Sequence, residues 1–356
     1  MAEKSQKKVF ASINYLRIIA CFLVLATHTN YIISNGSAQN TNNYFLLLYN
    51  IIAKTAVPIF FMISGALQLS KDYSYKDMIK KAMNRIILPL LIFSLVIHFK
   101  RNPSLDVNNI MNFIKYFLSN QILFPYWFLY TLFGLYIVTP ILRKCVSLLK
   151  DNDYKVYFAL SVILLSILPV FNHYNLIPTN KHLMIGLICI PMLYYILGYF
   201  IYNILEKIGK TKELIISLII FTVVAITPLI IIFDAKNGYG NTYWYDLASI
   251  PVFSLSLLFT YLFKFYVNSN FKLSFLNKVI DEISKNTLYI YMMQGILLGH
   301  FEFIYNFLVR HIHINNFILL LIYQIILFII LNIFASIIRG ILLIIKKGEI
   351  LWQKKN

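Results

Sequence analysis

The sequence predicts an all-α, polytopic membrane protein, a transmembrane helical bundle of about ten spans with both termini cytoplasmic. Hydrophobic residues make up 59% of the 356 residues and charged residues only 13%, with a mean hydropathy of +0.71. Soluble chains carry about 25% charged residues. Apolar runs of about 18–25 residues recur along the chain and are long enough to cross a bilayer as helices. The alternating segments of a membrane β-barrel are not seen.

The ten predicted spans form a single membrane-embedded domain over residues 1–356. They lie near 13–34, 44–69, 86–99, 123–142, 156–172, 183–204, 214–233, 246–264, 286–308 and 316–341. Connecting segments of different composition separate the spans. They are the polar segment 35–43, the basic segment 70–85, the long outer segment 100–123, the polar segment 172–181, the aromatic-rich segment 234–245, the basic segment 264–285 and the short segment 309–315. Residues 110–117, within the long outer segment, are predicted to form an interfacial helix.

Basic residues set the orientation of this bundle. With the N-terminus inside, 25 of the 32 lysines and arginines fall on the inner side, six fall outside, and Lys54 lies within the membrane. Inner connections rich in Lys and Arg are what the positive-inside rule describes. The net charge of +18 therefore reflects topology and not binding of nucleic acid. It also favours contact with anionic lipid or a phosphorylated cytosolic ligand.

The first span carries two ionisable residues, Arg17 and His28, eleven positions apart. At about 100° per residue they lie within roughly 20° of each other on one helix face, and about 16 Å apart along its axis. Ionisable groups at membrane depth usually face an interior or a watery cavity and mark function. A snorkelling arginine and a histidine bonded to a neighbouring helix are the structural alternative.

Other polar or aromatic residues within spans have two interpretations each. Lys54 either acts in the reaction, by stabilising an oxyanion or contacting the acyl donor, or serves packing by donating to a backbone carbonyl. Trp127 either walls an acyl pocket or belongs to the interface. Glu302 either contacts an acceptor or packs. Ser64-Gly65 favours close helix packing over a nucleophile. No histidine spacing matches a metal motif, so no metal is expected.

Aromatic residues crowd the outer connection 234–245, notably Tyr239, Tyr243, Trp244 and Tyr245. An interfacial aromatic belt explains such a cluster. Stacking on a sugar ring is the alternative, because an aromatic side chain offers a flat apolar face beside a polar group.

Five segments, in order along nearly the whole chain, resemble the acyltransferase family 3 proteins, which are integral membrane O-acyltransferases. They are YLRIIA at 15–20 leading to His28, VPIFFMISGA at 57–66, NRIILP at 84–89, YWFLY at 126–130 and SKNTLYIYMMQ at 284–294. The resemblance implies transfer of an acyl group, usually acetyl, from cytosolic acyl-coenzyme A to a hydroxyl, commonly on a cell-surface glycan. It also implies that His28 is essential, and that Arg17 and Arg85 bind the donor.

Two positions depart from the family pattern. Ala82 stands where a second arginine often precedes Arg85, and neighbouring Lys81 is expected to supply donor-binding charge without bidentate contacts. Gln294 stands where the ninth span often carries a histidine. Glutamine still offers hydrogen bonds, so Gln294 joins Lys54, Trp127 and Glu302 as a candidate for the acyl pocket or acceptor.

Acyl transfer from a thioester to a hydroxyl needs a base for the hydroxyl, a positioned acyl carbonyl, a group that stabilises the oxyanion and an anchored donor. Histidine suits the base, since its unperturbed pKa of about 6.5 lies near neutral pH. No Cys or Ser–His–Asp arrangement is evident, which favours direct transfer over an acyl-enzyme. The distance of about 16 Å from Arg17 to His28 is comparable to an extended pantetheine arm.

The rival interpretation is a transporter or flippase of a glycan or lipid-linked sugar. Proton-coupled transporters usually place several carboxylates in the bilayer, and here only Glu302 and Asp246 qualify. The sequence leaves the acceptor, the acyl chain length and the oligomeric state open. The expected setting is a bacterial plasma membrane, with acyl-coenzyme A, a glycan or lipid-linked sugar and membrane lipid as partners. Any second transfer step requires a separate extracellular transferase.

Overall fold

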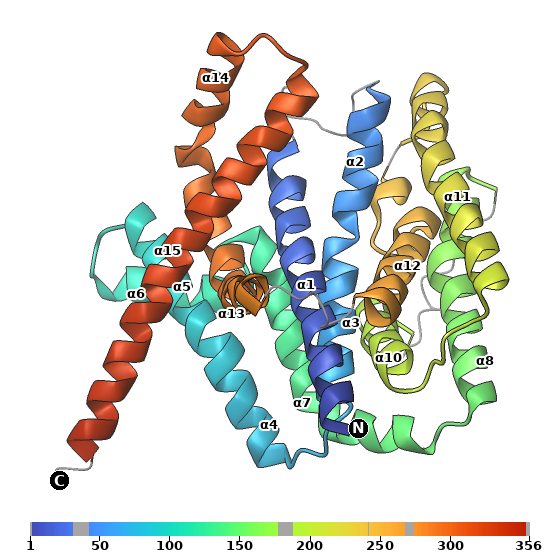
Figure 1. Cartoon of the computed structure of the whole chain (residues 1–356). Coiled ribbons are helices and arrows are strands. Elements are labelled where there is room, and N and C mark those ends of the chain that lie inside the picture. Colours follow the sequence, from blue (N-terminus) through green and yellow to red (C-terminus); the bar gives the residue numbers. More distant parts are fainter. Residues whose placement is uncertain (1, 31–42, 177–187, 241, 268–273, 354–356) are drawn as a thin grey trace.

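The computed structural model describes residues 2–30, 43–176, 188–240, 242–267 and 274–353, and every regular element in these ranges is helical (Figure 1). The predicted all-α class is therefore confirmed. The α-helices are α1 (Ala2–Thr29), α2 (Tyr44–Lys54), α3 (Ala56–Gln68), α4 (Tyr75–Ala82), α5 (Leu88–Arg101), α6 (Val107–Leu118), α7 (Trp127–Leu148), α8 (Asp151–Val162), α9 (Leu168–His173), α10 (Ile190–Asn203), α11 (Lys210–Lys236), α12 (Ile250–Tyr266), α13 (Ser274–Leu297), α14 (Glu302–His311) and α15 (Asn316–Gln353).

Eight helical stretches within the described ranges are long and apolar enough to cross a membrane. Of the remaining predicted spans, 183–204 falls on α10, with 183–187 outside the described residues, and 286–308 falls on α13 and α14. α10 has 14 residues and is largely buried among other helices, so it shows lipid little apolar surface. α13 opens with a polar stretch. The prediction of about ten spans agrees roughly with this arrangement.

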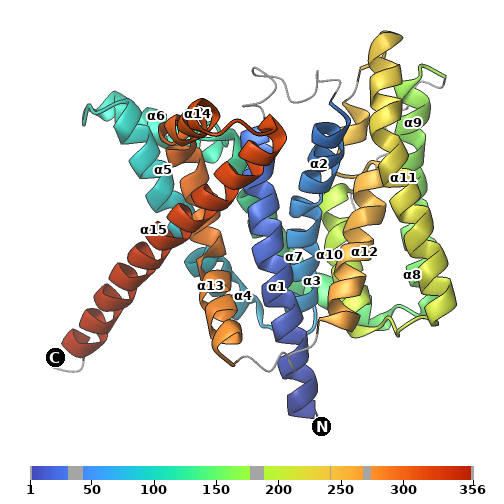
Figure 2. The ribbon, with the colours of Figure 1, turned by 45° about the horizontal axis from the view of Figure 1, so that its top comes forward.

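Helix α1 lies at the centre of the bundle. It packs against α2, α3, α12, α13 and α15. Side chains join it to α13: Asn14 Nδ2 donates to Asp281 Oδ1 at 2.8 Å, and Arg17 Nη1 donates to Ser284 Oγ at 3.2 Å. The start of α1 and the end of α15 lie at the same end of the bundle (Figure 2), as a chain with an even number of crossings requires.

Two glycines bring α3 and α10 into backbone contact. A Cβ atom on Gly65 would lie 1.8 Å from the carbonyl oxygen of Tyr195, and one on Gly198 would lie 2.0 Å from that of Met62. Small residues permit this close approach, which is a main source of helix association in membranes. The packing interpretation of Ser64-Gly65 is thus confirmed for Gly65.

Replacing Gly198 with alanine is expected to destabilise the protein by about 2 kcal/mol or more, because the new methyl group meets a backbone oxygen that cannot rotate away. Thermal unfolding of the purified protein in detergent measures this as a lower midpoint. Gly134→Ala on α7 is the matched control, since nothing lies within 4 Å of its added Cβ. Equal midpoints for the two variants would contradict the backbone contact.

The structure corrects the continuous ninth span predicted over 286–308. α13 ends at Leu297, a short 3-10 turn covers Leu298–His300, and α14 begins at Glu302. α14 runs roughly across the direction of α13 in both views (Figures 1 and 2). Gly299 weakens the helix at this point, and α14 leaves Phe303 and Phe307 exposed. The helix predicted over 110–117 is confirmed and lies within α6, while its place at the membrane interface stays a prediction.

Candidate active site

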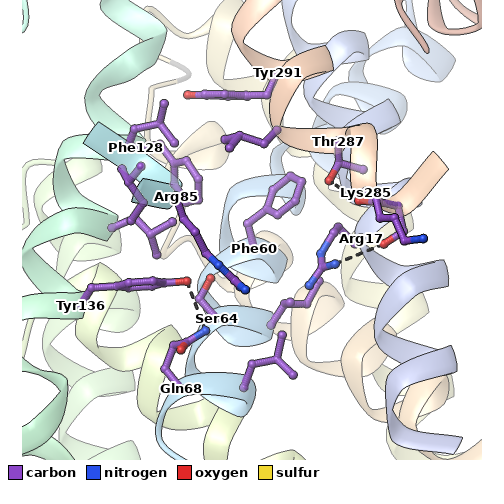
Figure 3. Close-up of a pocket in the computed structure, with 17 residues that line it drawn as sticks. Arg17, Phe60, Ser64, Gln68, Arg85, Phe128, Tyr136, Lys285, Thr287 and Tyr291 are labelled. Atoms are coloured by element: carbon purple, nitrogen blue, oxygen red, sulfur yellow. Dashed lines mark hydrogen bonds between the residues drawn. The ribbon is translucent and has the colours of Figure 1, made fainter. Parts of the chain in front are cut away.

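An inner cavity of about 250 Å³ lies between α1, α3, the segment 85–86, α7 and α13. Two guanidinium groups, those of Arg17 and Arg85, point into it with Ser64 beside them (Figure 3). Phe60, Phe128 and Tyr291 form its apolar upper part. The cavity thus combines two positively charged groups with an aromatic upper part.

The backbone at Arg85 departs from an α-helix. Met83–Ile87 forms a π turn, η2, between α4 and α5. Pro89 lacks an N–H and so cannot bond the carbonyl of Arg85 four residues earlier. The widened π turn accommodates this missing bond, and such turns are frequent at functional sites. The Arg85 side chain makes no hydrogen bond or ion pair with another described residue, so its five donors are available to a ligand.

Arg17 is held more firmly. Its Nη1 donates to Ser284 Oγ at 3.2 Å, and Ser284 Oγ donates to Asn14 Oδ1 at 3.0 Å. Lys285, also beside the cavity, pairs instead with Glu282 at 2.6 Å, and its ammonium points away from the guanidinium groups (Figure 3). Arg17 and Arg85 therefore supply the cavity's positive charge.

Lys81 does not line the inner cavity but supports its wall. Its Nζ donates to Gln68 Oε1 at 2.5 Å and to the Tyr73 hydroxyl at 2.7 Å. Gln68 Nε2 in turn donates to the Tyr136 hydroxyl at 3.2 Å, and both of those residues line the cavity (Figure 3). Lys81 thus fixes the orientation of Gln68.

A second cavity, of about 230 Å³, contains His28 and is called the His28 cavity below. Lys54 and Trp127 line it with His28, as do Tyr245 and Asp246 from the connection before α12. Lys54 makes no hydrogen bond or ion pair with another described residue, so its ammonium is available within the cavity. A neutral histidine nitrogen beside an ammonium suits proton transfer next to a developing negative charge.

A helix break places Lys54 in this cavity. α2 ends at Lys54 and α3 begins at Ala56, with Thr55 between them. Pro58 has no N–H to donate to the carbonyl of Lys54 four residues earlier, so the series of helical hydrogen bonds is interrupted there. The Thr55 hydroxyl bonds the carbonyl of Ile52 at 2.6 Å and caps the break.

A buried polar network holds the end of α1, directly after His28. Gln324 Nε2 donates to Thr29 Oγ1 at 2.8 Å and to Asn30 Oδ1 at 2.9 Å. Asn30 Nδ2 donates to Asn50 Oδ1, and the Tyr49 hydroxyl donates to Gln324 Oε1 at 2.7 Å. Satisfied buried networks of this kind are rigid, so α1, α2 and α15 fix the backbone beside His28.

The inner and His28 cavities meet at one side chain, Tyr291, which lines both. Its hydroxyl donates to the carbonyl of Pro125, and its ring meets Phe128 edge-on at 5.8 Å. Tyr291 is therefore the side chain that the two cavities share.

A comparison with known protein families matches residues 10–340 to the family described as "Acyltransferase domain". The chain belongs to this family. Searches of curated proteins and of solved structures found no match. The resemblance of the five segments is thus confirmed at the level of the family, and the protein is a multi-pass membrane protein of the acyltransferase family.

The structure of this acyltransferase brings together some of the predicted site residues. Arg17 and Arg85 share the inner cavity, while His28, Lys54 and Trp127 share the other. Gln294 and Glu302 line neither of them. Gln294 is 2% exposed and neither atom of its amide has a hydrogen-bond partner among the described residues. Glu302 begins α14, beyond the break after α13.

The sequence reasoning did not single out Tyr291, although it lies in a quoted segment. Ser284, which bonds Arg17, and Tyr291 are seven residues apart and therefore lie on one face of α13. That spacing indicates that Tyr291 faces the same cavity as Ser284. Gln68 and Tyr136 were missed as well. No local signal marks them, because α3, α4 and α7 meet there only in the folded chain.

Proposed function

We propose that this acyltransferase moves an acyl group, acetyl in the simplest case, from cytosolic acyl-coenzyme A to a hydroxyl of a cell-surface or exported glycan. The observation that carries this proposal is the pair of cavities. The inner cavity holds two guanidinium groups, and the His28 cavity holds a histidine and a lysine. The two cavities share Tyr291 and lie along the face of α1 that carries Arg17 and His28.

The inner cavity suits the phosphate end of coenzyme A. Guanidinium groups bind phosphate oxygens through paired hydrogen bonds, and Arg85 has donors free for this. Arg17, held by Ser284, presents a second positive charge in fixed geometry. The pantetheine arm and its thioester then extend past Tyr291 toward His28, with Trp127 as a wall for the acyl group.

Direct transfer proceeds in two balanced steps. An imidazole nitrogen of His28 takes the proton of the acceptor hydroxyl while its oxygen bonds to the thioester carbonyl carbon. The carbonyl oxygen becomes an oxyanion, which the Lys54 ammonium stabilises by a charge-assisted hydrogen bond. The carbonyl re-forms, the carbon–sulfur bond breaks, and the coenzyme A thiolate takes the proton from the imidazolium. The products are an ester and free coenzyme A.

The setting that we propose for this reaction is the plasma membrane of a bacterium, with the acceptor in the cell envelope. Phe124, Pro125, Tyr245 and Asp246 line the His28 cavity. They lie at or beside the ends of the two connections, 100–123 and 234–245, that the charge distribution assigns to the outer side. A glycan or lipid-linked sugar is thus the fitting acceptor. A separate extracellular transferase is the partner that we propose for any later transfer of the acyl group.

Purified protein in detergent, given acetyl-coenzyme A and a neutral glycan fraction from a bacterial envelope, is expected to release free coenzyme A and to acetylate the glycan in equal amounts. A thiol-reactive dye measures the release, and mass spectrometry measures the acetylated glycan. Release without glycan acetylation would indicate a thioesterase. Neither release nor binding of acetyl-coenzyme A would overturn the proposal and favour the transporter.

A further inference from the structure

A third cavity lies between the π turn at 163–167, α9, the start of α10 and the 3-10 turn η6 (Tyr243–Tyr245), and is called the outer cavity here. Its volume is about 290 Å³. It is lined by Leu164, Leu165, Pro169, Asn172, His173, Ile190, Thr242, Tyr243 and Asp246. The mechanism above uses none of these residues.

Buried hydrogen bonds hold the wall of the outer cavity in place. Asp234 has no exposed side-chain surface, and its carboxylate accepts from His173 Nε2 at 2.9 Å and from Trp244 Nε1 at 2.8 Å. The Tyr243 hydroxyl donates to the carbonyl of Ser166 at 2.8 Å. The His173 ring packs against Tyr243 and Trp244 with centroids 5.8 Å away in each case. A ligand therefore meets a preformed surface, which lowers the entropic penalty of binding.

Three aromatic residues of the outer connection are buried inside the protein. Tyr243, Trp244 and Tyr245 are all at most 7% exposed. Tyr243 lines the outer cavity, Tyr245 lines the His28 cavity, and Asp246 lines both. The turn η6 and Asp246 are therefore the partition between the two cavities.

We infer that the outer cavity binds a neutral sugar ring of the acceptor, and that Asp246 directs a hydroxyl of that acceptor toward His28. This inference rests on the proposed function. Among the described lining residues, Asp246 carries the only fixed charge, and a carboxylate accepts hydrogen bonds from hydroxyl groups but repels phosphate and uronate. The Asn172 amide makes no hydrogen bond to another described residue. Apolar and aromatic walls suit the carbon face of a pyranose.

Asn172 provides the cleanest test, because it lines the outer cavity only and is exposed. Asn172→Ala is expected to raise the KM for the glycan acceptor several-fold, through one lost hydrogen bond, and to leave the KM for acetyl-coenzyme A unchanged. Asp246→Asn is expected to raise the acceptor KM by about tenfold or more, since it removes a charged acceptor. Asn237→Ala, at the exposed end of α11, is the matched control and is expected to behave as wild type.

Binding without turnover separates this inference from the proposed function. Saturation-transfer NMR with a panel of neutral methyl hexosides and methyl N-acetylhexosaminides is expected to detect a binder with wild type, Asn237→Ala and His28→Asn. The affinity of that sugar is expected to fall several-fold in Asn172→Ala and by about tenfold or more in Asp246→Asn. If wild type acetylates the glycan but binds no sugar of the panel, the sugar site is overturned and the proposed transferase activity is not. The same holds if the acceptor KM is unchanged in both Asn172→Ala and Asp246→Asn. Sugar binding with no acetyl transfer by wild type would overturn the proposed function, and the acceptor assignment with it.

Discussion

His28→Asn is expected to lower the kcat of acyl transfer by about 10²- to 10⁴-fold, the range that a positioned general base contributes. Asparagine keeps a polar side chain of similar size and still donates and accepts hydrogen bonds. It cannot take a proton from the acceptor hydroxyl. Release of free coenzyme A from acetyl-coenzyme A measures the rate, and equilibrium binding of the donor is expected to stay within twofold of wild type, because the donor is anchored in the other cavity.

His313→Asn is the matched control, since that histidine is exposed in the connection between α14 and α15. Its rate is expected to equal that of wild type. If His28→Asn retained a rate within a few-fold of wild type, another group would have to be the base. If it lost donor binding instead, His28 would belong to the donor site and the division of roles between the two cavities would be wrong.

The sequence predicted the helical bundle because membrane helices are constrained by local features, namely length, apolarity and the distribution of charge. The phase of α1 also placed Arg17 and His28 on one face, and the structure puts them in two cavities that share Tyr291. The break between α13 and α14 was not foreseen. The apolar run 286–308 is continuous in composition, and a single glycine is weak evidence for a break.

The site was less predictable than the fold. The sequence placed Arg17 and His28 on the first span and Arg85 before the third, but it did not show that they divide between two cavities with Tyr291 at the junction. Lys81 was expected to bind the donor on charge alone, and the structure instead shows it bonded to Gln68 and Tyr73. Pairings of that kind depend on which helices meet, and no periodicity within one helix encodes them.

Arg85→Gln is expected to weaken the binding of acetyl-coenzyme A by about 10- to 100-fold, the loss that accompanies removal of a charged hydrogen-bonding partner. Its thermal stability is expected to stay close to that of wild type, because the Arg85 side chain has no partner among the described residues to lose. Isothermal titration with acetyl-coenzyme A measures the affinity. Saturating donor is expected to restore most of kcat, since the reacting groups lie in the His28 cavity.

Arg143→Gln is the matched control for charge at the inner face, because Arg143 bonds Tyr199 at 2.8 Å and lines neither cavity. Arg17→Gln offers an informative contrast with Arg85→Gln. Arg17 binds Ser284 across the α1–α13 contact, so its loss is expected to lower both the affinity for the donor and the midpoint of thermal unfolding. Arg85→Lys separates charge from geometry: lysine keeps the charge but not the paired hydrogen bonds. An unchanged affinity in Arg85→Gln would place the donor phosphates outside the inner cavity, and the route past Tyr291 would then lose its anchor.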